Sequence, residues 1–370
     1  ERRRVASTMA TWMLAQPAID DRDLVRAISW QIAARAPLAG DDAVCAAAVA
    51  LADGDFETAA DIAVAAANVV AEADRWRAGY VLAQARRQLG DIAGADVAFT
   101  DAARWATDDS DRVDVAIAHA HTLAIADTRS ADGLGLLRSI ASEVSDSSLL
   151  RRVAIERTFL SAVSGDFREV IGAAEELLAE PDLDDTTALS AANALAFARL
   201  MTLRLDRFDA DTERWRPTAV RMESTSPLAV EQLDLVTVIA RVAQGRIDEA
   251  IERCRDRRTG RTDRSWGAGD GAWAAVEIFG RSFRTDDPEG LVDLANRAAV
   301  GLGSVDPLGF RPVGSGLCAL ALANGGKMAQ AREAFAAGAA AGGEGDRRSS
   351  SLIRARLDAW GVALDGDPRT

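Results

Sequence analysis

Aromatic side chains are scarce in this 370-residue chain, at 5% of residues, and tyrosine occurs once, at Tyr80. A sheet-based fold depends on β-branched and aromatic residues, so a β-sandwich is not expected. Hydrophobic residues nevertheless make up 48% of the chain, which excludes an intrinsically disordered protein. Alanine is the commonest residue, and its small side chain favours closely packed helices. The composition therefore predicts an all-α fold.

Cysteine, lysine and long apolar runs are also rare or missing. The three cysteines, Cys45, Cys254 and Cys318, lie far apart without a CxxC pair, so neither a disulfide framework nor a zinc ribbon is expected. No run of about 18 apolar residues and no signal-peptide pattern occurs, which predicts a cytoplasmic protein without membrane contact. The net charge is −14, and Lys327 is the only lysine. An acidic surface repels the phosphate backbone, so direct binding of nucleic acid is not expected.

The sequence motifs of common enzymes are missing as well. The only lysine lies in Gly326-Lys327-Met328, without the first glycine and the hydroxyl residue of a phosphate-binding loop. His119 and His121 are two positions apart on an expected helix and point in different directions, so they do not form a metal site. The acid pairs Glu175-Glu176 and Asp184-Asp185 fit a solvated helix face and a helix start. These observations predict a chain that is not an enzyme and that holds no metal or cofactor.

Glycine turns recur along the otherwise helical pattern. Glycine takes the left-handed conformation that ends a helix, and a following aspartate caps the next helix. Five turns have this character: Gly54-Asp55-Phe56, Gly90-Asp91-Ile92, Gly165-Asp166-Phe167, Gly245-Arg246-Ile247 and Gly326-Lys327-Met328. Their glycines are 36, 75, 80 and 81 residues apart, so one degenerate repeat is expected inside each of the last three gaps. The hidden turns are expected at 126–130, 205–208 and 285–288.

The turns and their flanking residues resemble the tetratricopeptide repeat, a helical hairpin of about 34 residues. The match is closest around Gly90, with Ala83 on the first helix and Ala95 and Phe99 on the second. The resemblance implies an all-α protein, a right-handed α-α superhelix of about eight tetratricopeptide-like hairpins. In such an array each hairpin contacts only its neighbours.

The expected organisation divides the chain into three parts. Residues 1–40 form an N-terminal helical pair that links to a missing upstream module. Residues 41–343 form the repeat superhelix. Residues 344–370 form a C-terminal capping helix and tail, with the helix expected at 346–364.

The order of the first segments resembles a larger family. Helices expected at 2–16 and 21–36 are followed by Gly40, Asp41 and an alanine-rich hairpin. This order is similar to the region after the ATPase module of large ATP-binding LuxR-type transcriptional regulators, the class that includes the maltose regulator. The resemblance implies an effector-sensing arm, which takes a small-molecule inducer or a protein or peptide in its concave groove. ATP would then bind in the missing N-terminal portion, and the ATPase and helix-turn-helix domains of the full-length protein would be further partners. The start at Glu1, without methionine, agrees with a piece of a longer protein.

Two other functions remain open. The chain can be a stand-alone tetratricopeptide-repeat scaffold that binds peptides or proteins, or an all-α enzyme. An upstream phosphate-binding loop and a downstream helix-turn-helix domain would distinguish the regulator from the scaffold. Clustered acids in a closed cavity would favour the enzyme.

Candidate ligand-binding residues follow from the register of two turns. Counting back from Gly90 and Gly165 gives polar and apolar residues at steps of three and four, which share one helix face. A basic, glycine-rich stretch at 253–273 adds two tryptophans. A groove of this kind suits an anionic or amphipathic ligand. The candidates are Arg77, Tyr80, Gln84, Arg87, Arg152, Phe159, Trp266 and Trp273.

Overall fold

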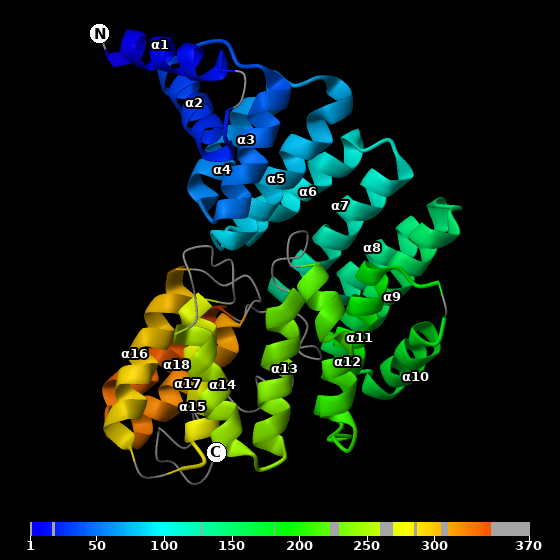
Figure 1. Cartoon of the computed structure of the whole chain (residues 1–370), viewed down its shortest axis with the longest axis vertical. Helices are drawn as coiled ribbons and strands as arrows, with labels where there is room; N and C mark the ends of the chain where they lie inside the picture. The colour runs from blue at the N-terminus through cyan, green and yellow to red at the C-terminus, as the bar shows by residue number, and fades with distance from the viewer. Residues whose placement is uncertain are drawn as a thin grey trace. The chain divides into compact units, whose positions relative to one another are not determined.

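Helices account for all regular structure in the part of the chain that the computed structural model describes. That part comprises residues 2–16, 19–126, 129–180, 182–222, 229–259, 269–284, 287–304 and 310–341. Within these ranges there is no strand, which confirms the all-α prediction (Figure 1). The capping helix expected at 346–364 lies outside the described residues.

The helices follow one another with short connections. In chain order they are α1 (Arg2–Leu14), α2 (Asp21–Ala34), α3 (Gly40–Asp53), α4 (Phe56–Ala67), the 3₁₀-helix η1 (Glu72–Asp74), α5 (Arg75–Gln88), α6 (Ile92–Trp105), α7 (Asp109–His121), the π-helical turn η2 (Thr122–Ala126), α8 (Ser130–Glu143), α9 (Ser147–Ser164), α10 (Phe167–Leu178), α11 (Asp185–Met201), α12 (Phe208–Arg221), α13 (Ala229–Ala243), α14 (Ile247–Thr259), α15 (Gly269–Arg281), α16 (Pro288–Ser304), α17 (Arg311–Asn324) and α18 (Met328–Ala341). None of the described helices is long and apolar enough to cross a membrane.

From α3 to α18 the helices form eight consecutive hairpins, as the repeat pattern predicts. The two helices of a hairpin pack on each other in α3/α4, α5/α6, α11/α12, α13/α14, α15/α16 and α17/α18. In α7/α8 an ion pair joins Arg112 to Glu143, and in α9/α10 the helices share a core with Ala162 and Val170. The helices α1 and α2 form a further pair before the array.

The turn glycines adopt the conformation that the sequence predicts. Gly54, Gly90, Gly165, Gly245 and Gly326 have φ values of 82°, 80°, 102°, 79° and 74°, and they are the positive-φ glycines of the described residues. The aspartate that follows caps the next helix in two cases: Asp55 accepts from the Thr58 amide at 3.1 Å, and Asp91 from the Gly94 amide at 2.9 Å. Asp166 makes no such side-chain bond, so its predicted capping role is not found.

One hidden repeat is visible at Leu203. This residue has φ 55°. The Leu203 amide donates to the Leu200 carbonyl, and the Arg204 amide donates to the Arg199 carbonyl. The amides of Gly90 and Asp91 make the equivalent hydrogen bonds at their own turn. The turn therefore starts two residues before the predicted segment 205–208. The displacement arises because a leucine, here 70% exposed, occupies the left-handed position at which the pattern expects glycine.

Replacing Gly90 by valine is expected to destabilise the protein by about 1–3 kcal/mol, because a β-branched residue is strained at positive φ. A Cβ atom at Gly90 would meet no atom within 4 Å, so the expected loss comes from backbone strain. Urea unfolding measures the loss. The reverse change, Leu203→Gly, is the control and is expected to cause no loss. An unchanged midpoint for Gly90→Val would contradict the left-handed turn.

The chain forms two compact units. One consists of Glu1–Leu123 and Leu136–Leu149, and the other of Ala124–Gly135 and Leu150–Thr370. In the first unit α3 packs beside α5. In the second, α11, α13, α15 and α17 pack side by side in sequence. The first helices of successive hairpins thus form one layer within each unit, which is the arrangement expected of stacked repeats.

Candidate functional site

The candidate residues on α5 have different surroundings. Arg77 is exposed, and its guanidinium lies 3.8 Å from the Asp74 carboxylate. Tyr80, Gln84 and Arg87 are half-buried. Gln84 Nε2 donates a hydrogen bond of 3.1 Å to the Tyr80 hydroxyl oxygen, so these two side chains hold each other in place.

Tyr80 belongs to an aromatic row that joins α5, α6 and α7. Its ring meets Trp76 and Phe99 edge-on, with ring centroids 6.4 and 6.0 Å apart. Phe99 is fully buried and stacks on the His119 ring at 5.3 Å, and His119 Nε2 lies 2.6 Å from Asp96 Oδ1. The tyrosine therefore contributes to packing between helices.

The register of other hairpins explains this role of Tyr80. Tyr80 precedes Gly90 by ten residues. The position ten residues before Gly54, Gly165 and Gly245 holds Val44, Ile155 and Leu235 in turn. All three of these residues are buried. The position is thus a packing position, and comparing the hairpins would have indicated this from the sequence alone.

The remaining candidates lie in the other unit or outside the described residues. Arg152 and Phe159 are half-buried on α9, in the second unit, whereas α5 belongs to the first. Phe159 packs on the core that α9, α10 and α11 share. Trp273 is completely buried in the core of α13–α17, so its position does not fit the predicted ligand-binding role. Trp266 lies outside the described residues.

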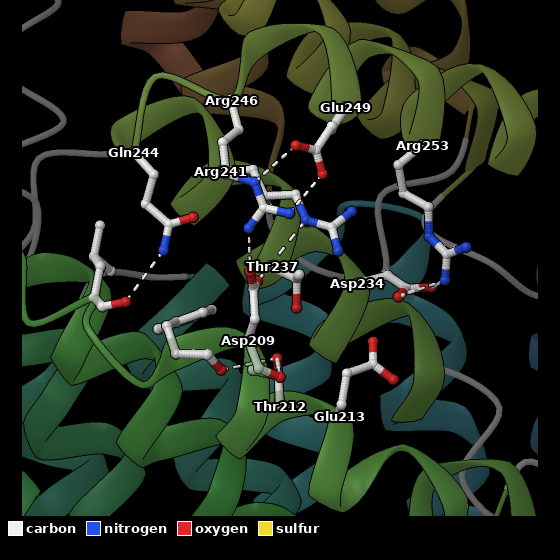
Figure 2. Close-up of polar contacts among 12 residues, drawn as sticks. Asp209, Thr212, Glu213, Asp234, Thr237, Arg241, Gln244, Arg246, Glu249 and Arg253 are labelled. Carbon is white, nitrogen blue, oxygen red and sulfur yellow. Dashed lines mark hydrogen bonds and ion pairs between the residues drawn. The ribbon is translucent and has the colours of Figure 1, made fainter.

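The arginine-rich stretch that begins at Arg253 is not a loop at its start, because α14 continues to Thr259. Its side chains meet two buried acids on the neighbouring helices. Asp234 on α13 is 1% exposed. Arg216 Nη2 donates to its Oδ1 at 2.6 Å, Arg253 Nη2 donates to the same oxygen at 3.1 Å, and Arg257 reaches its Oδ2 (Figure 2 shows Arg253 and Asp234).

Glu277 on α15 is the second buried acid, also 1% exposed. Arg258 Nη1 donates to its Oε2 at 2.7 Å, and Arg281 Nη2 lies 2.7 Å from its Oε1. Arg255 Nε donates to Oε1 at 3.3 Å. Hydrogen bonds to Asp270 and Glu277 raise the pKa of Arg258 despite its partial burial, which lowers it.

The two clusters fix α14 from both sides. Arg253 and Arg257 bind the acid of α13, whereas Arg255 and Arg258 bind the acid of α15. A buried carboxylate is tolerated only when it is paired and hydrogen-bonded. The basic run therefore has a structural role in these described residues, and the sequence did not indicate it.

A further polar junction lies between α12, α13 and α14 (Figure 2). Arg246 Nε donates to Glu249 Oε1 at 2.9 Å, and the same guanidinium contacts Asp209. These hydrogen bonds raise the pKa of Arg246. Arg241 Nε lies 3.8 Å from Asp209 Oδ1, and Gln244 Nε2 donates to the Leu205 carbonyl oxygen at 3.1 Å. The junction ties α14 to the preceding hairpin.

A small cavity lies between α11, α12 and α13. Its volume is about 10 Å³, and Arg199, Asp211 and Trp215 are among the lining residues. A cavity of this size holds about one water molecule. Small-molecule sites usually measure about 300–1,000 Å³, so this cavity is not an effector site.

Reactive groups are few among the described residues. Burial raises the pKa of the Cys254 and Cys318 thiols to about 12, so neither is a thiolate nucleophile near neutral pH. Within the described ranges no three His, Cys, Asp or Glu side chains come together as a metal site. His119 is nearly buried and His121 is half-buried.

Comparisons with known proteins leave the family open. No family model and no curated protein matches the sequence. Among solved structures, the complex described as "Structure of Naa15/Naa10 bound to HypK-THB" aligns with 12% identity over 100% of this chain and 69% of that chain, at a TM-score of 0.24. This likeness is too weak to support an assignment. The sequential hairpins of the chain themselves identify it as a helical repeat scaffold.

Proposed function

We propose that the chain is a non-catalytic repeat scaffold that binds a protein or peptide along the layer of first helices. The observation that carries the proposal is the side-by-side packing of α11, α13, α15 and α17, together with that of α3 and α5. Within each unit such a layer offers a continuous surface, and stacked helical repeats use surfaces of this kind for extended partners.

The arginine side chains of α5 are the first place to test this proposal. Arg77 and the half-buried Arg87 lie on the same helix face and suit acidic groups of a partner. Tyr80 is unsuitable for the test because it packs against Trp76 and Phe99. Arg104 on α6 is a matched control, since it is exposed on a second helix and pairs with Asp101 in the same way as Arg77 pairs with Asp74.

A screen of peptides and metabolites by thermal shift, followed by titration of the hits, is the experiment. A peptide ligand of the first-helix layer is expected to bind at least about tenfold more weakly to Arg77→Ala and Arg87→Ala, a loss of about 1.4 kcal/mol. Binding to Arg104→Ala is expected to stay unchanged. A hit that keeps its affinity in both α5 variants binds elsewhere and contradicts the assignment of the surface.

A more specific proposal is that this scaffold is the effector-sensing arm of an ATP-dependent LuxR-type regulator. The paired helices α1 and α2, followed by α3 at Gly40, keep the order on which that resemblance rests. The gene sequence on both sides is the test. A phosphate-binding loop upstream and a helix-turn-helix domain downstream would support the sensing arm. Their absence would leave the stand-alone scaffold.

The same proposal predicts that this 370-residue chain binds neither ATP nor operator DNA. Its only lysine does not lie in a phosphate-binding loop, and its net charge of −14 opposes DNA. Isothermal titration calorimetry measures the binding of ATP, and an electrophoretic mobility-shift assay at low salt measures the binding of operator DNA. Saturable ATP binding at micromolar concentration would contradict the assignment of ATP to another part of the protein.

A further inference from the structure

The first helix exposes an apolar stripe that its own unit does not cover. Val5, Met9 and Trp12 are 55%, 43% and 62% exposed. They follow one another at steps of four and three residues, so they lie on one face of α1. Another face is buried, with Ala10 and Met13 packed against α2. The apolar surface of α1 is therefore wider than the part that α2 covers.

Charged residues flank the apolar stripe at the start of α1 and at the start of α2. The first turn carries the exposed Arg3 and Arg4, although the helix macrodipole favours acidic residues there. At the other end the chain leads to Asp20 and Asp21 at the start of α2, both of which are exposed. Basic residues therefore lie at one end of α1, and acidic residues lie where the chain enters α2 after its other end.

We propose that this stripe is the contact surface of a homodimer in which the α1 helices of two copies pack antiparallel. The surface is complementary to itself in this orientation. Val5 of one copy meets the partner's Trp12, and Met9 lies on the two-fold axis beside the partner's Met9. The basic first turn then lies near the acidic start of α2 in the partner subunit. Residues of one patch contact the same patch on the other copy, as a two-fold interface requires.

The expected dimer is weak and sensitive to salt. A 13-residue helix offers less surface than the roughly 1,600 Å² of a standard interface, so a dissociation constant on the order of 100 µM is expected. Attraction between the charged ends is screened at high ionic strength. Sedimentation velocity over a concentration series is expected to show association of the full chain that weakens as salt is added.

A charge at the two-fold axis tests the geometry. Met9→Arg places two like charges opposite each other and is expected to weaken association at least about tenfold. Val97→Arg is the matched control, because Val97 is 59% exposed on α6, away from α1, and its variant is expected to associate like the wild type. Circular dichroism checks that both variants keep their helix content.

Cross-linking gives a second readout that does not depend on affinity alone. In a Cys45→Ser background, which removes the exposed native thiol, Met9→Cys is expected to form a disulfide-linked dimer under mild oxidation. Val97→Cys is expected to remain mostly monomeric. A chain that stays monomeric at about 1 mM, an unchanged dimer in Met9→Arg, or equal cross-linking of both cysteine variants would each overturn the proposal.

Discussion

Replacing Gly271 by alanine is expected to lower the free energy of unfolding by about 3 kcal/mol or more, at the upper end of overpacking effects. A Cβ atom at this position would lie 2.4 Å from the Leu302 backbone nitrogen and 2.6 Å from the Gly301 carbonyl carbon. Both contacts are with backbone, so no side chain can rotate away, and α15 and α16 have to separate. Urea unfolding followed by circular dichroism measures the change.

Gly172 is the matched control because it lies inside a helix, α10, and a Cβ there meets nothing within 4 Å. Alanine has the better helix propensity, so Gly172→Ala is expected to stabilise the protein by about 0.5–1 kcal/mol. The two identical substitutions should therefore have opposite effects. Equal midpoints would contradict the close crossing of α15 and α16.

Replacing Asp234 by asparagine is expected to cost about 3 kcal/mol, the value typical of breaking a buried ion pair from one side. The change removes the negative charge that Arg216, Arg253 and Arg257 share. The three side chains are 23%, 35% and 27% exposed, so partial hydration limits the loss to the lower end of the range. The midpoint of urea unfolding gives the measurement.

An exposed ion pair in the same unit serves as the control, because its loss shows how much stability the removal of a surface charge costs. Glu180 and Arg151 are 45% and 39% exposed, and their charged atoms are 3.5 Å apart. Glu180→Gln is expected to cost less than about 1 kcal/mol, as exposed ion pairs do. If both variants lose the same stability, Asp234 does not organise α14.

The turns of the fold could be predicted because their signal is local. A glycine at positive φ needs only its own backbone, and Gly54, Gly90, Gly165, Gly245 and Gly326 all have this conformation. The helical period on both sides then gives the hairpins. The turn at Leu203 lacks this signal, because a leucine and not a glycine has the left-handed conformation there.

The residues that join the helices could not be predicted in the same way. Pairing of Asp234 with Arg253, or of Glu277 with Arg258, depends on the rotation of each helix about its axis, which a single sequence does not give. The close approach of Gly271 and Gly301 also depends on the crossing of two helices. The packing of Tyr80 against Trp76 and Phe99 likewise depends on how α5 and α6 face each other.

Hydrogen exchange of the Gly326→Val variant, followed by mass spectrometry, tests the array of hairpins most directly. The substitution strains a turn with φ 74° between α17 and α18. In a stacked array, where each hairpin contacts its neighbours, exchange is expected to accelerate in α17 and α18 and less so in α15 and α16. The amides of α11 and α12 are expected to exchange as in the wild type. Equal acceleration in all hairpins would show a single cooperative core and would contradict the repeat architecture.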